Sequence, residues 1–204
     1  MRAMPESGAG RTYPLTIGEE PLFCPACGQP VTPRLLEEDH RPRLVCPDGY
    51  VTWRNPRMVV GTLPVREGRV FLARRAIEPG AGRWTYPGGY LEFGEAAQEG
   101  ARRETEEETR LLVEIGRLIG AYSRPHAGVV TLIYEAAVVG GEALPGLETI
   151  EVRSFAPDEI PWGDLAFTTA ESALRDWVAA QPGHAPRHEP ELYVTGDPSS
   201  ESAR

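Results

Sequence analysis

The sequence contains no lysine, so all 21 basic side chains are arginine, and they are outnumbered by 30 acidic ones to give a net charge of -9. This acidic balance disfavours nonspecific binding to nucleic acid or to an anionic membrane, and we expect neither as a partner. In the absence of lysine, a phosphate group would be bound by guanidinium groups, backbone amides or a divalent metal.

Long apolar runs are also missing. No stretch approaches the roughly 20 apolar residues of a membrane span, and the first 20 residues lack the apolar core of a secretory signal. We therefore expect a cytoplasmic protein. Cysteine is scarce as well: there are three, of which two form Cys24-x-x-Cys27. In a reducing compartment this spacing favours a bound metal over a disulfide.

Four segments differ in composition along the chain of 204 residues. We predict a flexible N-terminal arm over 1–20, a small cysteine-containing module over 21–56, a main domain over 57–180 and a flexible C-terminal tail over 181–204. The main domain has several strand-like runs on either side of one helix and ends in a second helix. This order predicts an α/β fold with a mixed sheet sandwiched between helices.

An unusual density of acid marks the first of these helices, because Gly88 to Leu111 holds seven glutamates in 24 residues. On a helix over 96–109, Glu107 and Glu108 lie at about -60° and about +40° from Glu104, on the small-residue face that should pack on the sheet. Carboxylates gathered there repel one another unless a cation collects them. Oxygen ligands of this kind suit Mg²⁺ or Mn²⁺, which commonly share substrate phosphates.

The same segment resembles the sequence box of the Nudix hydrolases, G-x5-E-x7-R-E-U-x-E-E-x-G-U with U aliphatic. The matching positions are Gly89, Glu95, Arg103, Glu104, Glu107, Glu108 and Leu111. Two positions depart from the box: Thr105 replaces an aliphatic residue, and Arg110 replaces a glycine. We expect Thr105 to perturb the packing modestly and Arg110 to be compatible with a helix C-terminus through the helix dipole.

The resemblance implies an α/β/α sandwich and a role for each box residue. Glu104, Glu107 and Glu108, with the Gly88 carbonyl, would hold the catalytic metal, Mg²⁺ or Mn²⁺. Arg103 would orient these carboxylates, while Gly89 and Glu95 would support the loop or the surroundings of the metal. The general base would be Glu108 or a loop acid, and Glu148 is the candidate for the loop acid. The alternative reading of Glu148 is an ordinary exposed glutamate in a loop.

The cysteine module resembles the zinc ribbon that precedes the catalytic domain in one branch of the family. Cys24, Cys27 and Cys46 match zinc ligands, but the second Cys-x-x-Cys is incomplete. Either Asp48 or His40 could complete a structural Zn²⁺ site, because carboxylate and imidazole both bind zinc; alternatively the module has lost its metal. We expect a structural or dimer-forming role, and a homodimer is compatible with the resemblance.

The resemblance implies hydrolysis of a nucleoside diphosphate linked to another group, with ADP-ribose or FAD favoured, to give AMP and a phosphorylated product. NADH ranks lower because the downstream Ser-Gln-Pro-Trp-Pro-Phe-Pro motif is missing. A non-catalytic nucleotide sensor on the same fold is the alternative. Candidate substrate-binding residues are the arginines Arg74, Arg75 and Arg83, the aromatic residues Trp84, Tyr86 and Tyr122, and Pro125. The arginines could equally be solvated, the aromatic rings could fill the sheet face, and the proline could be purely structural.

Overall fold

The computed structural model describes residues 21–37 and 39–181. The predicted arm over 1–20 and nearly all of the predicted tail lie outside the described residues. The chain divides into two compact units. The first extends to Asn55 and also includes His126–Gly128, and the second comprises Pro56–Pro125 and the chain from Val129 onwards.

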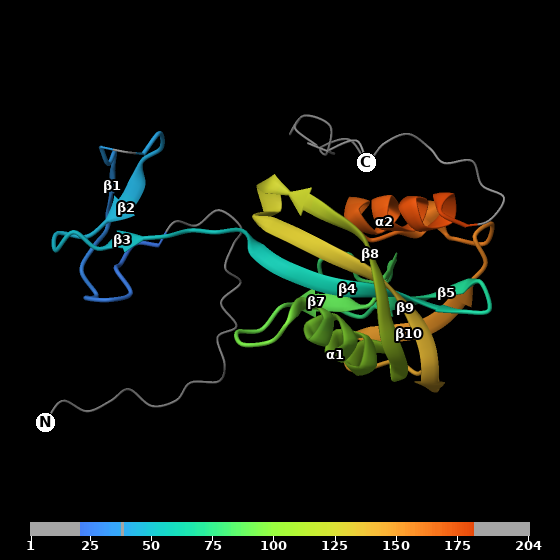
Figure 1. Ribbon diagram of the computed structural model, residues 1–204. Helices are drawn as coiled ribbons and strands as arrows, with labels where there is room; N and C mark the ends of the chain where they lie inside the picture. The colour runs from blue at the N-terminus through green and yellow to red at the C-terminus, as the bar shows by residue number, and fades with distance from the viewer. Residues whose placement is uncertain (1–20, 38, 182–204) are drawn as a thin grey trace, which may run out of the picture. The chain divides into compact units, whose positions relative to one another are not determined.

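The first unit contains a three-stranded antiparallel sheet. Its strands are β1 (Thr32–Arg34), β2 (Arg43–Val45) and β3 (Val51–Thr52), in that order (Figure 1). Two tight turns, one before β1 and one after β2, carry the cysteines. With strands of only two or three residues, this unit can bury very little apolar surface.

The second unit is built on a seven-stranded mixed sheet with the order β10-β5-β4-β9-β8, to which β6 and β7 are attached beside β5 and β4. The central β4 and β9 are parallel, and the other pairs are antiparallel. The strands are β4 (Arg57–Arg66), β5 (Arg69–Arg75), β6 (Trp84–Thr85), β7 (Gly88–Tyr90), β8 (Leu111–Arg124), β9 (Val129–Gly141) and β10 (Thr149–Phe155).

Two α-helices cover opposite faces of this sheet, α1 (Ala97–Thr109) and α2 (Thr168–Ala179) (Figure 1). Short 3-10 helices, η1 (Pro125–Ala127) and η2 (Trp162–Asp164), lie in the connections. The larger core packs under α2 around the fully buried Trp177, and a smaller one packs under α1 around Val60 and Ala101. The predicted α/β/α sandwich with a mixed sheet is confirmed.

The two departures from the Nudix box lie at structurally different places on α1. Thr105 is fully buried, yet its hydroxyl is satisfied: it donates to the Ala101 carbonyl at 2.6 Å and lies 2.7 Å from the Thr62 hydroxyl on β4. A threonine pair therefore fills the aliphatic position without leaving a buried polar group unpaired. Arg110 ends the helix in the left-handed conformation, at φ 60°, which glycine adopts without steric cost.

The loop between β9 and β10 covers the C-terminal end of α1. The amide of Leu144 donates to the Thr109 carbonyl, and that of Gly146 donates to the Glu108 carbonyl, each at 3.0 Å. These bonds satisfy carbonyls that have no partner within the helix. A Cβ on Gly146 would lie 2.1 Å from the Glu107 carbonyl oxygen, so the close approach requires glycine. The loop thereby brings Glu148 beside the acidic helix.

Candidate active site

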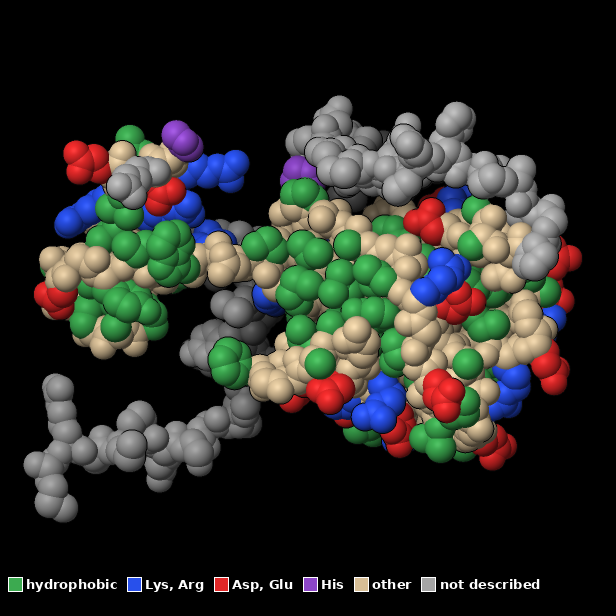
Figure 2. Space-filling view, in the orientation of Figure 1, with side chains coloured by type: hydrophobic (Ala, Val, Ile, Leu, Met, Phe, Trp, Pro, Cys, Tyr) green, Lys and Arg blue, Asp and Glu red, His purple; other side chains and the backbone are tan. Residues whose placement is uncertain are grey.

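Arg103 is the hub of the acidic side chains on α1. Its Nε and Nη2 donate to the two carboxylate oxygens of Glu95 at 3.0 and 2.9 Å. Its Nη1 donates to Glu104 at 2.8 Å and to Glu107 at 3.2 Å, and Nη2 also reaches the Tyr90 carbonyl at 3.2 Å. One guanidinium group thus hydrogen-bonds three carboxylates and partly offsets their charge, a geometry that suits a positioning residue. Acidic and basic side chains lie side by side over α1 (Figure 2).

Glu95 is the strongest partner of this guanidinium. Hydrogen bonds from Arg103, supported by the backbone amide of Glu92, lower the pKa of Glu95 to about 2. Glu95 is therefore ionised throughout the physiological range and fixes Arg103 to the loop before α1. A Cβ on Gly100 would lie 2.5 Å from a Glu95 carboxylate oxygen, so glycine leaves the space that this pairing needs.

Glu104 lies over the backbone of β7, and Gly89 makes room for it. A Cβ added to Gly89 would lie 2.5 to 2.6 Å from all three atoms of the Glu104 carboxylate group. Burial raises the pKa of Glu104; Arg103 opposes this shift, and the charges of Glu107 and Glu148 add to it. The specified glycine of the box is therefore explained by direct contact with a specified glutamate.

Glu108 is the most deeply enclosed of the three acids and points to the turn before β7. It accepts a hydrogen bond from the Gly88 amide at 3.0 Å. Burial raises its pKa to about 7; the Gly88 amide and Arg75 oppose the shift, and Glu104 and Glu148 increase it. A carboxylate held in this way is destabilised in its charged form, and a nearby cation would relieve that cost.

Glu107 and Glu148 complete the acidic group from the solvent side. The side chain of Glu107 is 58% exposed, and one of its carboxylate oxygens lies 3.2 Å from Nη1 of Arg103. Glu148 is exposed, and its charge raises the pKa of both Glu104 and Glu108, which places it near them. Its backbone carbonyl accepts from the Ala76 amide at 2.8 Å, which fixes the start of β10 beside β5.

These carboxylates fit a divalent metal that binds oxygen, but they are not a closed cage. Within residues 21–37 and 39–181, three or more potential ligand atoms approach within 4.8 Å of one another only in the cysteine cluster. Glu104 and Glu107 both accept from Nη1 of Arg103, and Glu108 accepts from the Gly88 amide. Mg²⁺ usually retains waters and uses few protein ligands, so an open arrangement of acids around two glycines is compatible with its binding.

The predicted aromatic contacts to substrate all lie in the core. Trp84, Tyr86 and Tyr122 are 3, 5 and 8% exposed and belong to the cluster under α2. Trp84 packs edge-to-face on Phe155 with ring centroids 5.0 Å apart. The Tyr122 hydroxyl donates to Asp176 on α2 at 2.7 Å. These contacts favour a packing role for the three rings over stacking on a base.

The other predicted substrate-binding residues are dispersed. The Nε of Arg74 donates to the Gly82 carbonyl at 2.7 Å, and its Nη1 lies 3.8 Å from Glu151, so this side chain is engaged within the sheet. Arg83 is exposed in the loop before β6, and Pro125 is exposed at the start of η1. Arg75 differs from them, because its charge acts on Glu108.

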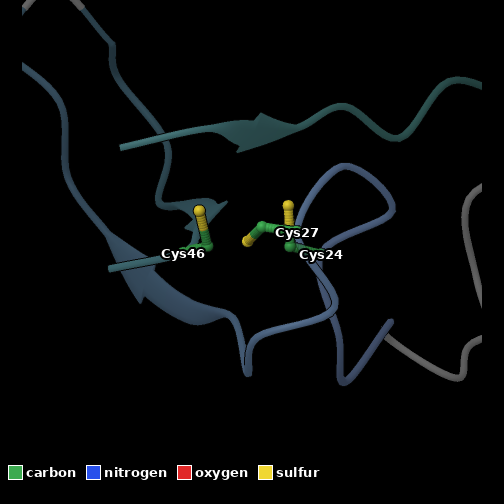
Figure 3. A group of neighbouring side chains, drawn as sticks. All are labelled: Cys24, Cys27 and Cys46. Carbon is green, nitrogen blue, oxygen red and sulfur yellow. The ribbon is translucent and has the colours of Figure 1, made fainter. Parts of the chain in front are cut away.

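The first unit brings its three cysteines together. The sulfur atoms of Cys24, Cys27 and Cys46 lie within 4.8 Å of one another and point into one space between the two turns (Figure 3). The Gln29 amide favours the Cys27 thiolate, but desolvation and the adjacent sulfur atoms outweigh it and raise the pKa of Cys27 to about 11. Desolvation opposes ionisation of Cys24 too, but hydrogen bonds from the Cys27 and Ala26 amides and from the adjacent thiols outweigh it and lower the pKa of Cys24. A bound Zn²⁺ would stabilise the cysteines as thiolates.

Neither proposed fourth ligand, Asp48 or His40, belongs to this sulfur cluster. The two turns explain why. In the first, the amide of Gly28 (φ 70°) donates to the Cys24 carbonyl; in the second, the amide of Gly49 (φ 85°) donates to the Cys46 carbonyl. The second turn is one residue shorter than the first. Asp48, which directly precedes Gly49, therefore takes the place that Cys27 has before Gly28. The Asp48 carboxylate accepts from Gln29 Nε2 at 3.0 Å instead of facing the sulfur atoms.

Comparison with known proteins follows the same division of the chain. The family model described as NUDIX domain matches residues 55–180, and the one described as Nudix N-terminal matches residues 22–52. A crystal structure of a NUDIX hydrolase from Nitrosomonas europaea is 39% identical, with a TM-score of 0.75 over 81% of this chain and 96% of that one.

Two curated relatives carry more particular names. One, named ADP-ribose pyrophosphatase, from Methanocaldococcus jannaschii, is 29% identical over 63% of this chain and 77% of its own length. Another, named NAD-capped RNA hydrolase NudC, from Stutzerimonas stutzeri, is 31% identical over 71% of this chain but only 45% of its own length.

The fold, the box on α1 and the matched domain define a class of enzyme: the chain belongs to the Nudix hydrolase family. It also carries the N-terminal module found in one branch of that family. The predicted family and enzyme class are confirmed. The expectation that nucleic acid is excluded as a partner is not supported, because a relative is named for an RNA substrate. Within the described residues, no helix combines the length and hydropathy of a membrane span.

Proposed function

We propose that this chain is a Mg²⁺- or Mn²⁺-dependent hydrolase that splits the diphosphate bond of a nucleoside diphosphate linked to another group. ADP-ribose is the favoured substrate, with FAD second, and the products are AMP and a phosphorylated partner. Two contacts carry the proposal. The Glu104 carboxylate lies so close to Gly89 that no Cβ would fit there, and the Gly88 amide donates a hydrogen bond to Glu108. They join the loop and the helix of the box in one acidic site.

In this proposal Glu104, Glu107 and Glu108, with the Gly88 carbonyl, hold the metal. A bound divalent cation would neutralise the diphosphate and promote attack by water. Arg103 keeps Glu104 and Glu107 in place, and Glu95 keeps Arg103 in place. The water oxygen forms a new bond to phosphorus, the bridging P–O bond breaks, and the proton of the water passes to Glu148. Glu148 is favoured over Glu108 as the base because Glu108 is engaged with Gly88.

The substrate preference is supported by the relative named ADP-ribose pyrophosphatase. The relative named NAD-capped RNA hydrolase makes an adenine dinucleotide at an RNA end a further candidate, after ADP-ribose and FAD. We further propose that residues 21–56 form a separate module in which Cys24, Cys27 and Cys46 hold a structural Zn²⁺, and that residues 57–180 form the catalytic domain. The division of the chain at Asn55 supports these boundaries.

A substrate panel tests the proposal. The purified chain would be incubated in Mg²⁺ with ADP-ribose, FAD, NADH, CoA, diadenosine polyphosphates and a short NAD-capped RNA, and the products would be identified by mass. We expect AMP from ADP-ribose or FAD, and no product in EDTA. Binding of these compounds without turnover of any would overturn the proposal in favour of a nucleotide sensor. If the capped RNA alone is hydrolysed, NAD-capped RNA would take the place of ADP-ribose as the favoured substrate.

A further inference from the structure

Two arginines share one aromatic ring at the end of the second unit's sheet. Arg75 ends β5 and Arg124 ends β8, and their guanidinium carbons lie 5.1 and 5.5 Å from the ring centroid of Phe167, just before α2. Both arginines and Phe167 are partly buried. Each guanidinium gains a cation–π contact, but two positive charges held close to one ring repel each other. We call Arg75, Phe167 and Arg124 the arginine clamp.

The arginine clamp forms no ion pair within residues 21–37 and 39–181. Among the residues that the structure describes, no carboxylate oxygen lies within 4.0 Å of Arg75 or Arg124, whereas Arg69, Arg103 and Arg175 all form such pairs. Arg75 uses its Nε to donate to the Pro79 carbonyl at 2.7 Å, which fixes the side chain without neutralising it. In a chain with a net charge of -9, two unneutralised, partly buried arginines on one ring form a local site for an anion.

The clamp adjoins the acidic site through Tyr86. The ring of Tyr86 packs on the backbone of β4 and β7, since a Cβ on Gly61 or Gly88 would lie 2.8 or 3.2 Å from it. The Gly88 amide donates to Glu108 at 3.0 Å, so Tyr86 packs against the same backbone that contacts this acid. Arg75 pairs with Thr149 across β5 and β10, and the adjacent Ala76 amide donates to the Glu148 carbonyl at 2.8 Å. The clamp and the acidic residues are therefore joined through the ends of the same strands.

This arrangement leads to a role for the two arginines. We propose that Arg75 and Arg124, held on the ring of Phe167, bind a phosphate of the substrate on the side of the site away from the α1 carboxylates. The inference rests on the proposed function, because it assigns a substrate-binding role to residues opposite the α1 carboxylates in the same site. The acids would hold the substrate through the cation, and the guanidinium forks would contact the diphosphate directly. Each fork can make two parallel charge-assisted hydrogen bonds to phosphate oxygens.

Binding of a non-hydrolysable probe tests the clamp without turnover. The probe is α,β-methylene-ADP in Mg²⁺, titrated calorimetrically into the wild type, Arg75→Gln and Arg124→Gln. We expect each substitution to weaken binding by about tenfold or more, as loss of a charge-assisted hydrogen bond does. Lysine at either position, which keeps the charge but loses the fork, should give a smaller loss. Arg66→Gln is the matched control, because Arg66 also lies over a phenylalanine, Phe71, at 5.9 Å.

The outcomes separate this proposal from the proposed function. Unchanged probe affinity in both glutamine variants, with melting temperatures like that of the wild type, would overturn the clamp even if the wild type hydrolyses ADP-ribose. An equal loss in Arg66→Gln would also overturn it, since the effect would then be one of net charge. Conversely, a wild type that binds the probe through Arg75 and Arg124 but hydrolyses nothing would retain the clamp and refute the hydrolase. If a glutamine variant fails to fold, Phe167→Leu, which removes the ring but keeps an apolar side chain, replaces it and should also weaken binding.

Discussion

The sulfur atoms of Cys24, Cys27 and Cys46 lie within 4.8 Å of one another, whereas no three carboxylates of the described part of the chain, those of α1 included, come so close. The first site is compact but has three ligands where a structural zinc commonly has four. The second has every acid that the family box specifies, but in a more open arrangement. Thiols tolerate close approach because a protonated thiol carries no charge, and the raised pKa of Cys27 keeps that side chain neutral without a metal.

Carboxylates behave differently because they are charged at neutral pH unless the protein prevents it. Around α1, Arg103 hydrogen-bonds Glu95, Glu104 and Glu107 and partly offsets their charge, and burial brings the pKa of Glu108 to about 7. The comparison separates a preassembled cluster of ligands from an open group of acids that would share a cation with water and substrate. A structural site gains from being closed before the metal arrives, and a catalytic one must leave room for water and substrate.

The largest expected effect comes from Glu108→Gln. If Glu108 holds the catalytic metal, turnover should fall by about 10²-fold or more, the order seen when transition-state charge loses a stabilising group. The fold should survive, because a glutamine oxygen can still accept from the Gly88 amide. Steady-state kinetics on the best substrate measures the loss. Glu106→Gln, on the exposed side of α1, is the control; an equal loss in that variant would mean that the helix carries no specific site.

The thiol site should respond in metal content and not in catalysis. We expect about one zinc per chain in the wild type, and none after Cys24→Ser, because two thiols and a hydroxyl bind zinc poorly. Elemental analysis of the purified chains measures this directly. Asp48→Asn should retain its zinc, since the Asp48 carboxylate faces Gln29. An Asp48→Asn chain that loses zinc as completely as Cys24→Ser would show that Asp48 is the fourth ligand.

The sequence predicted the fold and the helix that carries the acidic residues, for a physical reason. Glu104, Glu107 and Glu108 are placed by helical periodicity, which is local, and α1 was predicted to within a residue. Contacts between segments that are distant in the sequence could not be predicted from such local periodicity. Nothing in the sequence indicates that Phe167 collects Arg75 and Arg124, or that Gly146 caps α1, because each depends on how separate strands end.

The aromatic residues show the same limit. Trp84, Tyr86 and Tyr122 lie close to the box in sequence, which made them candidates for contact with substrate. In the structure they fill the core under α2, since their side chains, from β6, the residue that follows it and the last part of β8, belong to the cluster that packs on that helix. Sequence proximity gives the neighbourhood of a side chain, and only strand register gives the face of the sheet on which it lies.

Removing the hub of the acidic site should cost stability as well as activity. Arg103→Met keeps the aliphatic stem but leaves Glu95 and Glu104 without their counter-charge. We expect the free energy of unfolding to fall by about 1–3 kcal/mol, as when a partly buried ionic network is broken. Urea denaturation measures it. Arg102→Met, on the adjacent exposed position, should change stability by no more than about 0.5 kcal/mol; equal losses in the two variants would deny Arg103 its role as hub.

The ionisation of Glu95 should make the stability of the protein depend on pH in the acidic range. Its pKa is lowered from the ordinary 4.5 to about 2, so the native state favours the charged form. The stabilisation is fully present above about pH 4.5 and is lost as the pH falls towards 2. The difference in melting temperature between the wild type and Glu95→Gln should therefore shrink from pH 6 to pH 3, in chelator. A difference that is constant over this range would show that Glu95 is not selectively stabilised in its charged form.

The smallest expected effect concerns Arg110, where the chain departs from the glycine of the box. Its φ of 60° costs a residue with a side chain about 1 kcal/mol or more. Glycine removes that strain, but it increases the entropy of the unfolded chain and loses the favourable charge at the helix end. Because these terms oppose each other, Arg110→Gly should raise the free energy of unfolding by only about 0.5 kcal/mol.

Glu67, the other described residue with a positive φ that is not glycine, provides the comparison. It lies in the turn between β4 and β5, far from any helix end, so Glu67→Gly tests the backbone term alone and should stabilise the chain at least as much. Chemical denaturation of both variants against the wild type measures the two values. If Arg110→Gly is destabilising while Glu67→Gly is stabilising, the charge of Arg110 at the end of α1 outweighs its backbone strain. That result would tie the departure from the box to the electrostatics of the acidic helix.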